Sequence, residues 1–173
     1  MRALIIALAL SAAAAPAALA QTVVLVRHAE KANDGSSNPP LAAEGAARAA
    51  ELARTLADAD LTHVFVTPLR RTQDTARPAA EAHALTPEAV PLDGGVEAHV
   101  RAVADKVRAL PTDAVALVVG HSNTVPLIAR ALGQTGPGEM KDCEYDRLTV
   151  ISLEGDGDSP AVVSRYGEPS PRC

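Results

Sequence analysis

Two histidines each follow a short apolar run that is typical of a buried strand. His28 comes after Thr22–Val26 with Arg27 directly before it, and His121 follows Ala114–Val119 after a single glycine. Continuous runs of Val, Leu and Ala fit strands that are covered on both faces of a sheet. In open α/β sheets ligands bind at the carboxyl ends of the strands, so both imidazoles are predicted to share one pocket. An imidazole beside a guanidinium suits nucleophilic attack on an anionic group.

A third basic segment follows another predicted strand, His63–Val66. Thr67-Pro68 after it has the pattern of a helix start, with threonine as the cap and proline in the first turn. The predicted helix carries Arg70 and Arg71 at the same edge of the sheet as the two histidines. Arginine suits a phosphate because its fork makes two charge-assisted hydrogen bonds, and a helix start adds unpaired N–H groups. The spacing alone does not choose between the two arginines.

The predicted elements alternate between strand and helix, which is typical of a largely parallel sheet with helices on both faces. Beyond the strands above, the sequence predicts helices over Leu41–Ala57, residues 67–83, Val96–Leu110 and Thr124–Leu132, an edge strand over Glu88–Pro91, and a hairpin of Arg147–Leu153 and Ala161–Tyr166 around the turn at 154–158. The fold class is therefore α/β, a three-layer α/β/α sandwich whose sheet is mostly parallel with an antiparallel C-terminal hairpin.

The first predicted helix is amphipathic. Leu52 and Leu56 lie on its buried stripe, while Arg48 and Arg54 are predicted to face solvent. The loop before it, Asn33–Pro40, is rich in Asn, Gly, Ser and Pro and is too polar for regular structure. We interpret this loop as a candidate substrate lid.

The three basic segments resemble the motifs of the histidine phosphatase superfamily, which includes cofactor-dependent phosphoglycerate mutases and acid phosphatases. The similar motifs are Val26-Arg27-His28-Ala29-Glu30, Thr67-x-Leu69-x-Arg71-Thr72-x-Asp74-Thr75-Ala76 and Gly120-His121-Ser122, in the family's order, with Asp74 where the family usually has Gln or Glu. The resemblance implies a phosphohistidine mechanism with His28 as the nucleophile, while Arg27, Arg71 and His121 hold the phosphoryl oxygens. It selects Arg71 over Arg70, which is then a surface residue. Positioning and charge neutralisation by these side chains require no metal or cofactor.

Members of this family also use a carboxylate to protonate the leaving oxygen, and no motif here identifies it. Asp93, after the short edge strand, is the first candidate, and Glu97 near the start of the next helix is the second. Glu30, two residues after the nucleophile, is the third. Each of the three is explained equally well as a solvated acid.

The first residues have the pattern of an export signal. Arg2 gives a positive start, Ala3–Leu10 form an apolar run, and Ala18-Leu19-Ala20 is a small-x-small cleavage box. We expect a signal peptide over residues 1–20 and a histidine phosphatase domain over residues 21–173, in the periplasm or outside the cell. The alternative is an uncut membrane anchor, but the apolar run is short for a span of about 20 residues. No membrane span is expected after cleavage.

Charge and composition limit the partners of the chain. The formal net charge is −5, and aromatic residues make up only 2% of the sequence. Without a basic cluster or an aromatic stacking platform, nucleic acid is not an expected partner. An anionic small substrate has to be captured by local arginines against this net charge. No pattern indicates an oligomeric state, and the Cys and His spacings match no zinc cluster.

The chain contains two cysteines, Cys143 and Cys173. In an oxidising compartment they are expected to form a disulfide that ties the tail to the loop before the last strands. Two free thiols are the alternative. Because neither cysteine lies at a strand end with the basic motifs, the bridge is predicted to affect stability and not turnover.

The resemblance and the predicted export imply an exported phosphomonoesterase that acts through His28 on a small phosphorylated substrate, with a cell-envelope sugar phosphate as one candidate. A mutase reaction needs a phosphorylated cofactor and a cytosolic substrate, which export disfavours. A non-catalytic phosphate- or phosphosugar-binding protein of the same fold stays open because no acid is identified, although the intact His28 argues against it. A two-histidine metal site lacks a nearby carboxylate ligand, and the arginines would repel a cation.

Overall fold

A six-stranded sheet forms the centre of the molecule. The computed structural model describes residues 20–153 and 158–170. The strands are β1 (Gln21–Arg27), β2 (His63–Val66), β3 (Glu88–Ala89), β4 (Val115–Gly120), β5 (Arg147–Leu153) and β6 (Ala161–Arg165), in the order β3-β2-β4-β1-β5-β6. The first four strands of this order are parallel, and β5 and β6 are antiparallel to their neighbours. The predicted mostly parallel sheet with an antiparallel C-terminal hairpin is confirmed.

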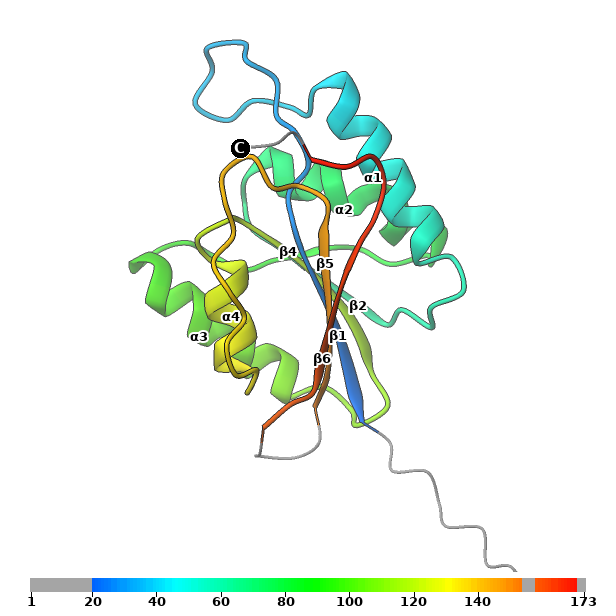
Figure 1. Cartoon of the computed structure of the whole chain (residues 1–173), viewed down its shortest axis with the longest axis vertical. Coiled ribbons are helices and arrows are strands. Elements are labelled where there is room, and N and C mark those ends of the chain that lie inside the picture. The colour runs from blue at the N-terminus through cyan, green and yellow to red at the C-terminus, as the bar shows by residue number, and fades with distance from the viewer. Residues whose placement is uncertain (1–19, 154–157, 171–173) are drawn as a thin grey trace, which may run out of the picture.

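Two helices cover each face of the sheet (Figure 1). The helices are α1 (Ala43–Thr55), α2 (Arg70–Ala82), α3 (Gly95–Arg108) and α4 (Val125–Ala131). Because successive side chains of a strand point to opposite faces, Val23 and Leu25 of β1 pack in the core under α3 and α4, while Val24 and Val26 pack under α1 and α2. The predicted stripe of α1 is buried in the second of these cores. The three-layer architecture is therefore confirmed.

The strand register brings three strand ends to one edge of the sheet. Arg27 at the end of β1 lies opposite Gly120 at the end of β4, and Phe65 of β2 lies opposite Val118 of β4. The residues that follow β1, β2 and β4 therefore leave the sheet side by side. This edge is where the candidate site lies.

The start of α2 differs from the prediction. The helix begins at Arg70, after an extended Leu69, and not at Thr67-Pro68. The Thr67 hydroxyl instead faces the hydroxyl of Thr72 at 2.9 Å and accepts a hydrogen bond from the Leu69 N–H at 3.3 Å. Residues 67–69 thus form a turn between β2 and α2, which leaves the Thr67 side chain at the end of the strand.

The prediction that Arg48 faces solvent is wrong, because this side chain is buried. Arg48 of α1 pairs with Glu30 and donates two more hydrogen bonds to the carbonyls of Tyr166 and Glu168 after β6. The reason is the close approach of α1 to the chain leaving β1. A Cβ on Gly45 would lie 2.1 Å from the Glu30 carbonyl oxygen, so only glycine fits this contact.

Several predictions fall on residues outside those described. They are the predicted signal peptide up to residue 19, the centre of the turn at 154–157, and Cys173. Export and the disulfide therefore stay predictions. Over residues 20–153 and 158–170, no helix has the length and apolar character needed to cross a membrane.

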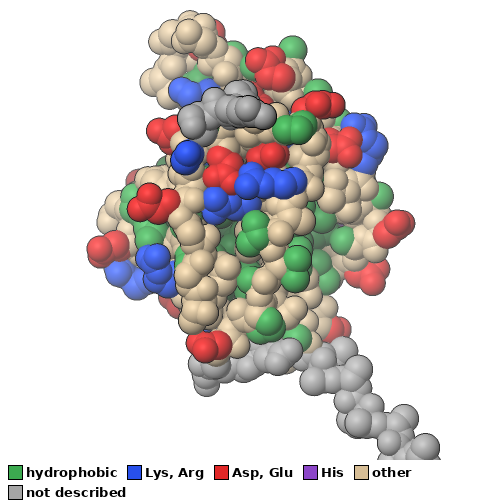
Figure 2. Space-filling view, in the orientation of Figure 1, with side chains coloured by type: hydrophobic (Ala, Val, Ile, Leu, Met, Phe, Trp, Pro, Cys, Tyr) green, Lys and Arg blue, Asp and Glu red, His purple; other side chains and the backbone are tan. Residues whose placement is uncertain are grey.

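The surface carries charges of both signs. On the face shown in Figure 2, Lys and Arg side chains lie against Asp and Glu side chains in its upper half. Around the start of β5, Arg147 pairs with Glu144, and Arg165 pairs with both Glu144 and Asp146. These arginines are neutralised by their neighbours. Capture of an anion therefore depends on arginines that have no carboxylate partner.

Candidate active site

The ends of β1 and β4 bring the two predicted histidines together. The ring centroids of His28 and His121 lie 5.3 Å apart, with 64° between the ring planes. The His28 backbone N–H donates to the Gly120 carbonyl at 2.9 Å, which continues the β1–β4 pairing past the strand ends. Both side chains are buried.

The imidazole of His28 is oriented and neutral. Its Nδ1 lies 2.8 Å from the Ala29 carbonyl oxygen. A carbonyl oxygen only accepts, so Nδ1 carries the proton and Nε2 carries the free lone pair. Burial lowers the pKa of His28 to about 3, and the positive charges of Arg27 and Arg71 and the neighbouring His121 lower it further, against a smaller opposing effect of the Ala29 hydrogen bond. Near neutral pH His28 is therefore an available nucleophile.

His121 contacts Thr67, the residue that the sequence predicts as the cap of a helix. The Thr67 Oγ1 lies 3.2 Å from His121 Nε2. Burial lowers the pKa of His121 to about 4, and Arg71, His99 and Arg27 lower it as well. When the Thr67 hydroxyl donates to Nε2, the single N–H of the neutral imidazole is on Nδ1 and can donate to a phosphoryl oxygen. Thr67 directly follows β2, and this position at a strand end is the sequence signal that could have predicted the contact.

Two guanidinium groups lie beside the imidazoles. The Nε atoms of Arg27 and of Arg71 are both buried and have no hydrogen-bond partner among the described residues. Burial lowers the pKa of both arginines, and the charge of Arg27 lowers that of Arg71 further. Buried N–H donors without partners are costly, and a bound oxyanion would satisfy them.

A threonine of α2 connects the arginine and histidine segments. The Thr75 hydroxyl donates to the Arg71 carbonyl at 2.7 Å and accepts a hydrogen bond from the Ala29 N–H at 2.9 Å. Thr75 is fully buried. It therefore fixes the first turn of α2 against the residue whose carbonyl orients His28.

The two adjacent arginines of α2 have different surroundings. Arg70 is exposed and pairs with Asp74 one turn along the helix at 3.3 Å. Its backbone N–H donates to the side-chain oxygen of Asn38, which attaches the candidate lid loop to the start of α2. Arg71 is half-buried, and its charge acts on both histidines. The geometry agrees with the choice of Arg71 that the motif alignment makes.

The three candidate acids are placed differently. Glu30 is held by Arg48, whose Nη2 lies 2.7 Å from one carboxylate oxygen, and a carboxylate in an ion pair is poorly suited to donate a proton. Asp93 and Glu97 are exposed, and neither bonds to the histidines or arginines of the site within the described part of the chain. The proton donor is therefore not identified by these contacts, and Glu30 becomes the weakest of the three candidates.

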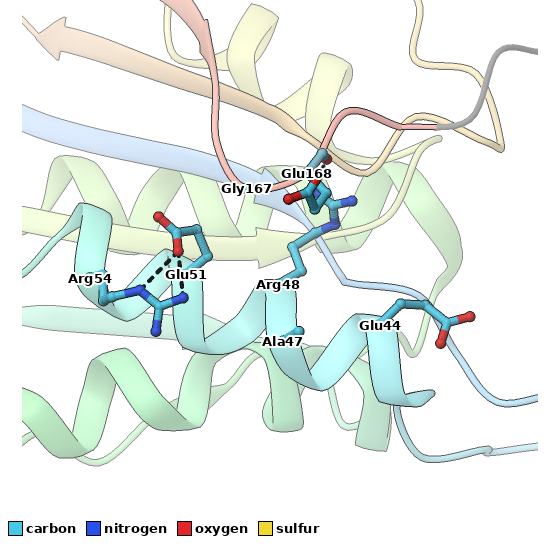
Figure 3. Close-up of a pocket in the computed structure, with 7 residues that line it drawn as sticks. All are labelled: Glu44, Ala47, Arg48, Glu51, Arg54, Gly167 and Glu168. Atoms are coloured by element: carbon cyan, nitrogen blue, oxygen red, sulfur yellow. Dashed lines mark hydrogen bonds and ion pairs between the residues drawn. The ribbon is translucent and has the colours of Figure 1, made fainter.

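A separate hollow lies over α1. It has a volume of about 480 Å³ and is lined by Glu44, Ala47, Arg48, Glu51, Arg54, Gly167 and Glu168 (Figure 3). In the figure Arg48 points toward the segment that contains Gly167 and Glu168, while Arg54 is paired with Glu51. Three glutamates surround two arginines that already have partners, so this hollow does not suit a phosphate.

The donor set at the sheet edge does not suit a metal ion. Over the described ranges, no group of three or more His, Cys, Asp or Glu side chains is arranged to hold one. The two imidazoles are flanked by guanidinium groups and not by carboxylates. Guanidinium groups favour an anion over a cation at this edge of the sheet.

Residues 23–92 match the family model described as histidine phosphatase superfamily (branch 1), a segment that contains Arg27, His28 and Arg71. This segment of the chain is similar to the histidine phosphatase superfamily.

Other proteins are similar to this chain in part of the sequence or in the fold. An uncharacterized protein of Mycobacterium tuberculosis, Rv0525, is 49% identical over 51 residues, which are 30% of this chain and 25% of that protein. The chain thus aligns with about a quarter of the relative's length. The protein histidine phosphatase SixA complexed with tungstate has a TM-score of 0.64 at 20% identity, covering 86% of this chain and 96% of that one. Mycobacterial glucosyl-3-phosphoglycerate phosphatase Rv2419c has a TM-score of 0.59 at 15% identity, covering 86% and 100%. The two structures show the shared fold.

Proposed function

We propose that this protein is an exported phosphomonoesterase that works through a phosphohistidine on His28. The observation that carries the proposal is the pair of buried, unpartnered Nε atoms of Arg27 and Arg71 beside a neutral imidazole. Each guanidinium offers charge-assisted donors to a tetrahedral oxyanion, and together they compensate its negative charge.

The reaction has two steps. In the first, the Nε2 lone pair of His28 attacks phosphorus in line with the leaving oxygen, the P–O bond breaks, and the alcohol leaves with a proton from an acid. In the second, water attacks the phosphohistidine, the P–N bond breaks, and inorganic phosphate is released. Arg27, Arg71 and the N–H of His121 hold the three equatorial oxygens, where charge is spread in the transition state.

The proposed substrate is a small phosphate monoester in the cell envelope. The predicted signal peptide supports an envelope location, and one structural neighbour is a glucosyl-3-phosphoglycerate phosphatase. A sugar phosphate is therefore the first substrate class to test. The protein histidine phosphatase SixA is another neighbour, and a phosphohistidine peptide, which is not a phosphate monoester, serves as a comparison substrate that the proposed enzyme should not prefer.

The experiment compares the mature protein with its His28→Ala variant. Wild type should form an acid-labile phosphoenzyme and turn over a phosphomonoester, and the variant should lose both, with turnover falling about 10³-fold or more. His63→Ala is the matched control, because His63 stacks on Phe65 at the start of β2, away from the cluster. Substrate panels are run with and without a chelator. Complete inhibition by chelator that zinc reverses would contradict the mechanism.

The same experiment tests the non-catalytic alternative. A phosphate-binding protein would bind inorganic phosphate through the two arginines yet form no phosphoenzyme with any ester of the panel. Export is tested separately by expressing the full chain and sequencing the N-terminus of the exported protein. A mature protein that begins at Gln21 would support the leader, while an intact N-terminus held in the membrane fraction would indicate an anchor.

A further inference from the structure

The segment before β5 binds one edge of the Arg27 guanidinium. Arg27 Nη1 donates to the carbonyl oxygens of Lys141, Asp142 and Glu144 at 3.0, 2.6 and 3.3 Å. These three acceptors are nearly consecutive in the chain, so the segment curls around a single nitrogen. None of them is a carboxylate, so these three contacts orient the Arg27 guanidinium without neutralising its charge.

The next residue of this segment covers a face of the same guanidinium. The Arg27 Cζ lies 4.2 Å from the centroid of the Tyr145 ring, a distance typical of a cation–π contact. The Tyr145 ring also lies 6.2 Å from the His28 ring, tilted by 59°. Tyr145 therefore borders both the arginine and the nucleophile of the site.

Tyr145 is itself fixed by the C-terminal segment. The Ser170 Oγ accepts hydrogen bonds from the backbone N–H groups of Tyr145 at 2.7 Å and Asp146 at 3.0 Å, and donates to the Asp146 carboxylate at 2.7 Å. The same carboxylate oxygen of Asp146 accepts from Arg165 of β6. The backbone at Tyr145 is thus anchored by a network that includes β6 and the segment after it.

With Nη1 bound and one face covered, the free edge of Arg27 consists of Nε and Nη2. The Nε is buried and has no partner in the described residues. These two nitrogens present parallel N–H groups, the arrangement that binds two oxygens of a phosphoryl group at once. The orientation of this edge depends on what holds the rest of the guanidinium.

We propose that Tyr145 is a positioning residue for the phosphoryl group, acting through Arg27. Its ring face sets the plane of the guanidinium so that the Nε–Nη2 edge faces the phosphorus held at His28. The assignment rests on the proposed function for the identity of the ligand. It involves the ring of Tyr145 and not its hydroxyl group.

The test measures both turnover and binding of orthovanadate, an oxyanion that adopts the trigonal bipyramidal geometry of phosphoryl transfer. Tyr145→Leu removes the aromatic face and should weaken orthovanadate binding about tenfold, with kcat/KM falling by a similar factor. Tyr145→Phe keeps the face and should stay within about twofold of wild type. Thermal melting verifies the fold, and Tyr145→Met replaces the leucine variant if that one does not fold.

A double-mutant cycle separates a positioning role from a general structural one. In an Arg27→Ala background, Tyr145→Leu should weaken orthovanadate binding no further, because the residue through which it acts is gone. An equal loss in both backgrounds would overturn the proposal, as would a folded Tyr145→Leu protein with wild-type binding. A Tyr145→Phe variant as weak as Tyr145→Leu would also overturn it, since the hydroxyl would then contact the ligand.

The experiment distinguishes failure of the proposal for Tyr145 from failure of the proposal for catalysis. If wild type binds orthovanadate but forms no phosphoenzyme, the catalytic proposal fails while the binding cycle still tests Tyr145. If wild type binds no oxyanion, both proposals fail.

Discussion

Arg27 and Arg48 are two buried arginines on either side of the chain that leaves β1, and their surroundings are opposite. Their exposed fractions are similar, 6% and 5%. Arg48 binds the Glu30 carboxylate with two nitrogens and two backbone carbonyls with a third. Burial alone would lower the Arg48 pKa, but the hydrogen bonds and charge of Glu30 outweigh it and raise the pKa. Arg27 has no carboxylate bonded to it among residues 20–153 and 158–170, and burial lowers its pKa.

The difference in hydrogen-bond partners separates a structural arginine from one that can bind a ligand. A buried cation that is fully paired joins elements of the fold, here β1, α1 and the segment after β6, and removing it leaves a buried carboxylate. A buried cation with an unpartnered donor lowers stability and persists where a ligand satisfies it. Arg71, with its own buried Nε, belongs with Arg27. Whether a buried guanidinium is paired with a carboxylate therefore indicates the role of the arginine better than its exposed fraction does.

The largest expected effect is on turnover when an arginine with an unpartnered donor is removed. Arg71→Ala should lower kcat about 10²-fold or more, because the lost donors act on charge that develops in the transition state. The melting temperature should be unchanged or higher, since a half-buried charge with an unpartnered buried Nε is removed. Steady-state kinetics and thermal melting measure the two. A variant that loses stability but keeps kcat would mean that Arg71, like Arg48, has a structural role.

Removal of the paired arginine should have the reverse outcome. Arg48→Met leaves Glu30 without its partner and should cost about 3 kcal/mol in the free energy of unfolding, measured by urea denaturation. The matched control is Arg54→Ala on the same helix, where the exposed pair with Glu51 contributes about 0.5 kcal/mol or less. The folded fraction of Arg48→Met should retain kcat within about threefold. A loss of kcat as large as that of Arg71→Ala would show that Glu30 acts in the chemistry.

Stability should depend on pH through the site histidines. The pKa values of His28 and His121, about 3 and about 4, lie below the ordinary 6.5, so between these values the unfolded chain binds more protons. The free energy of unfolding is then largest above about pH 7 and falls with decreasing pH, by about 2 kcal/mol for each histidine down to pH 5. Glu144 and Asp146, whose pKa values are also lowered, act at lower pH.

Urea denaturation at pH 7 and pH 5 measures this dependence. His28→Asn should remove about half of the decrease, because one of the two buried neutral imidazoles is gone. His63→Asn is the control, and it should show the decrease of wild type. An unchanged decrease in His28→Asn would mean that the pKa of His28 is the same in the folded and the unfolded protein, so that the site does not hold this imidazole neutral and its assignment would fail.

The contrast between the two arginines also explains what the sequence could predict. The fold and the gathering of Arg27, His28 and His121 with the start of α2 follow from apolar runs that end in basic residues, because parallel strands end at one edge. The choice of Arg71 over Arg70 came from the resemblance of the motif to the family. The burial of Arg48 did not follow, since an alanine-rich helix does not show which of its sides meets the sheet and Glu30 is 18 residues away. The Tyr145 contact was missed for the same reason, because cation–π partners 118 positions apart leave no periodic signal.

The prediction about the cysteines rests on neither of them lying at a strand end with the basic motifs. The structure adds a contact that this reasoning did not consider, because the carbonyls of Asp142 and Glu144 on either side of Cys143 bind Arg27. Spacing along the chain could not show this, since the segment crosses from α4 to the end of β1. A bridge to Cys173 stays a prediction, and its removal is now expected to change turnover as well as stability.

The smallest effect is expected at Arg70, the neighbour of Arg71 in sequence. Its side chain is exposed, and its ion pair with Asp74 shares that carboxylate with Arg77. Arg70→Ala should therefore change the free energy of unfolding by about 0.5 kcal/mol or less and kcat by less than about threefold. The two adjacent variants are measured side by side with the same ester. If Arg70→Ala lost more turnover than Arg71→Ala, the alignment of this motif would be off by one residue, and the unpartnered Nε of Arg71 would have no bearing on catalysis.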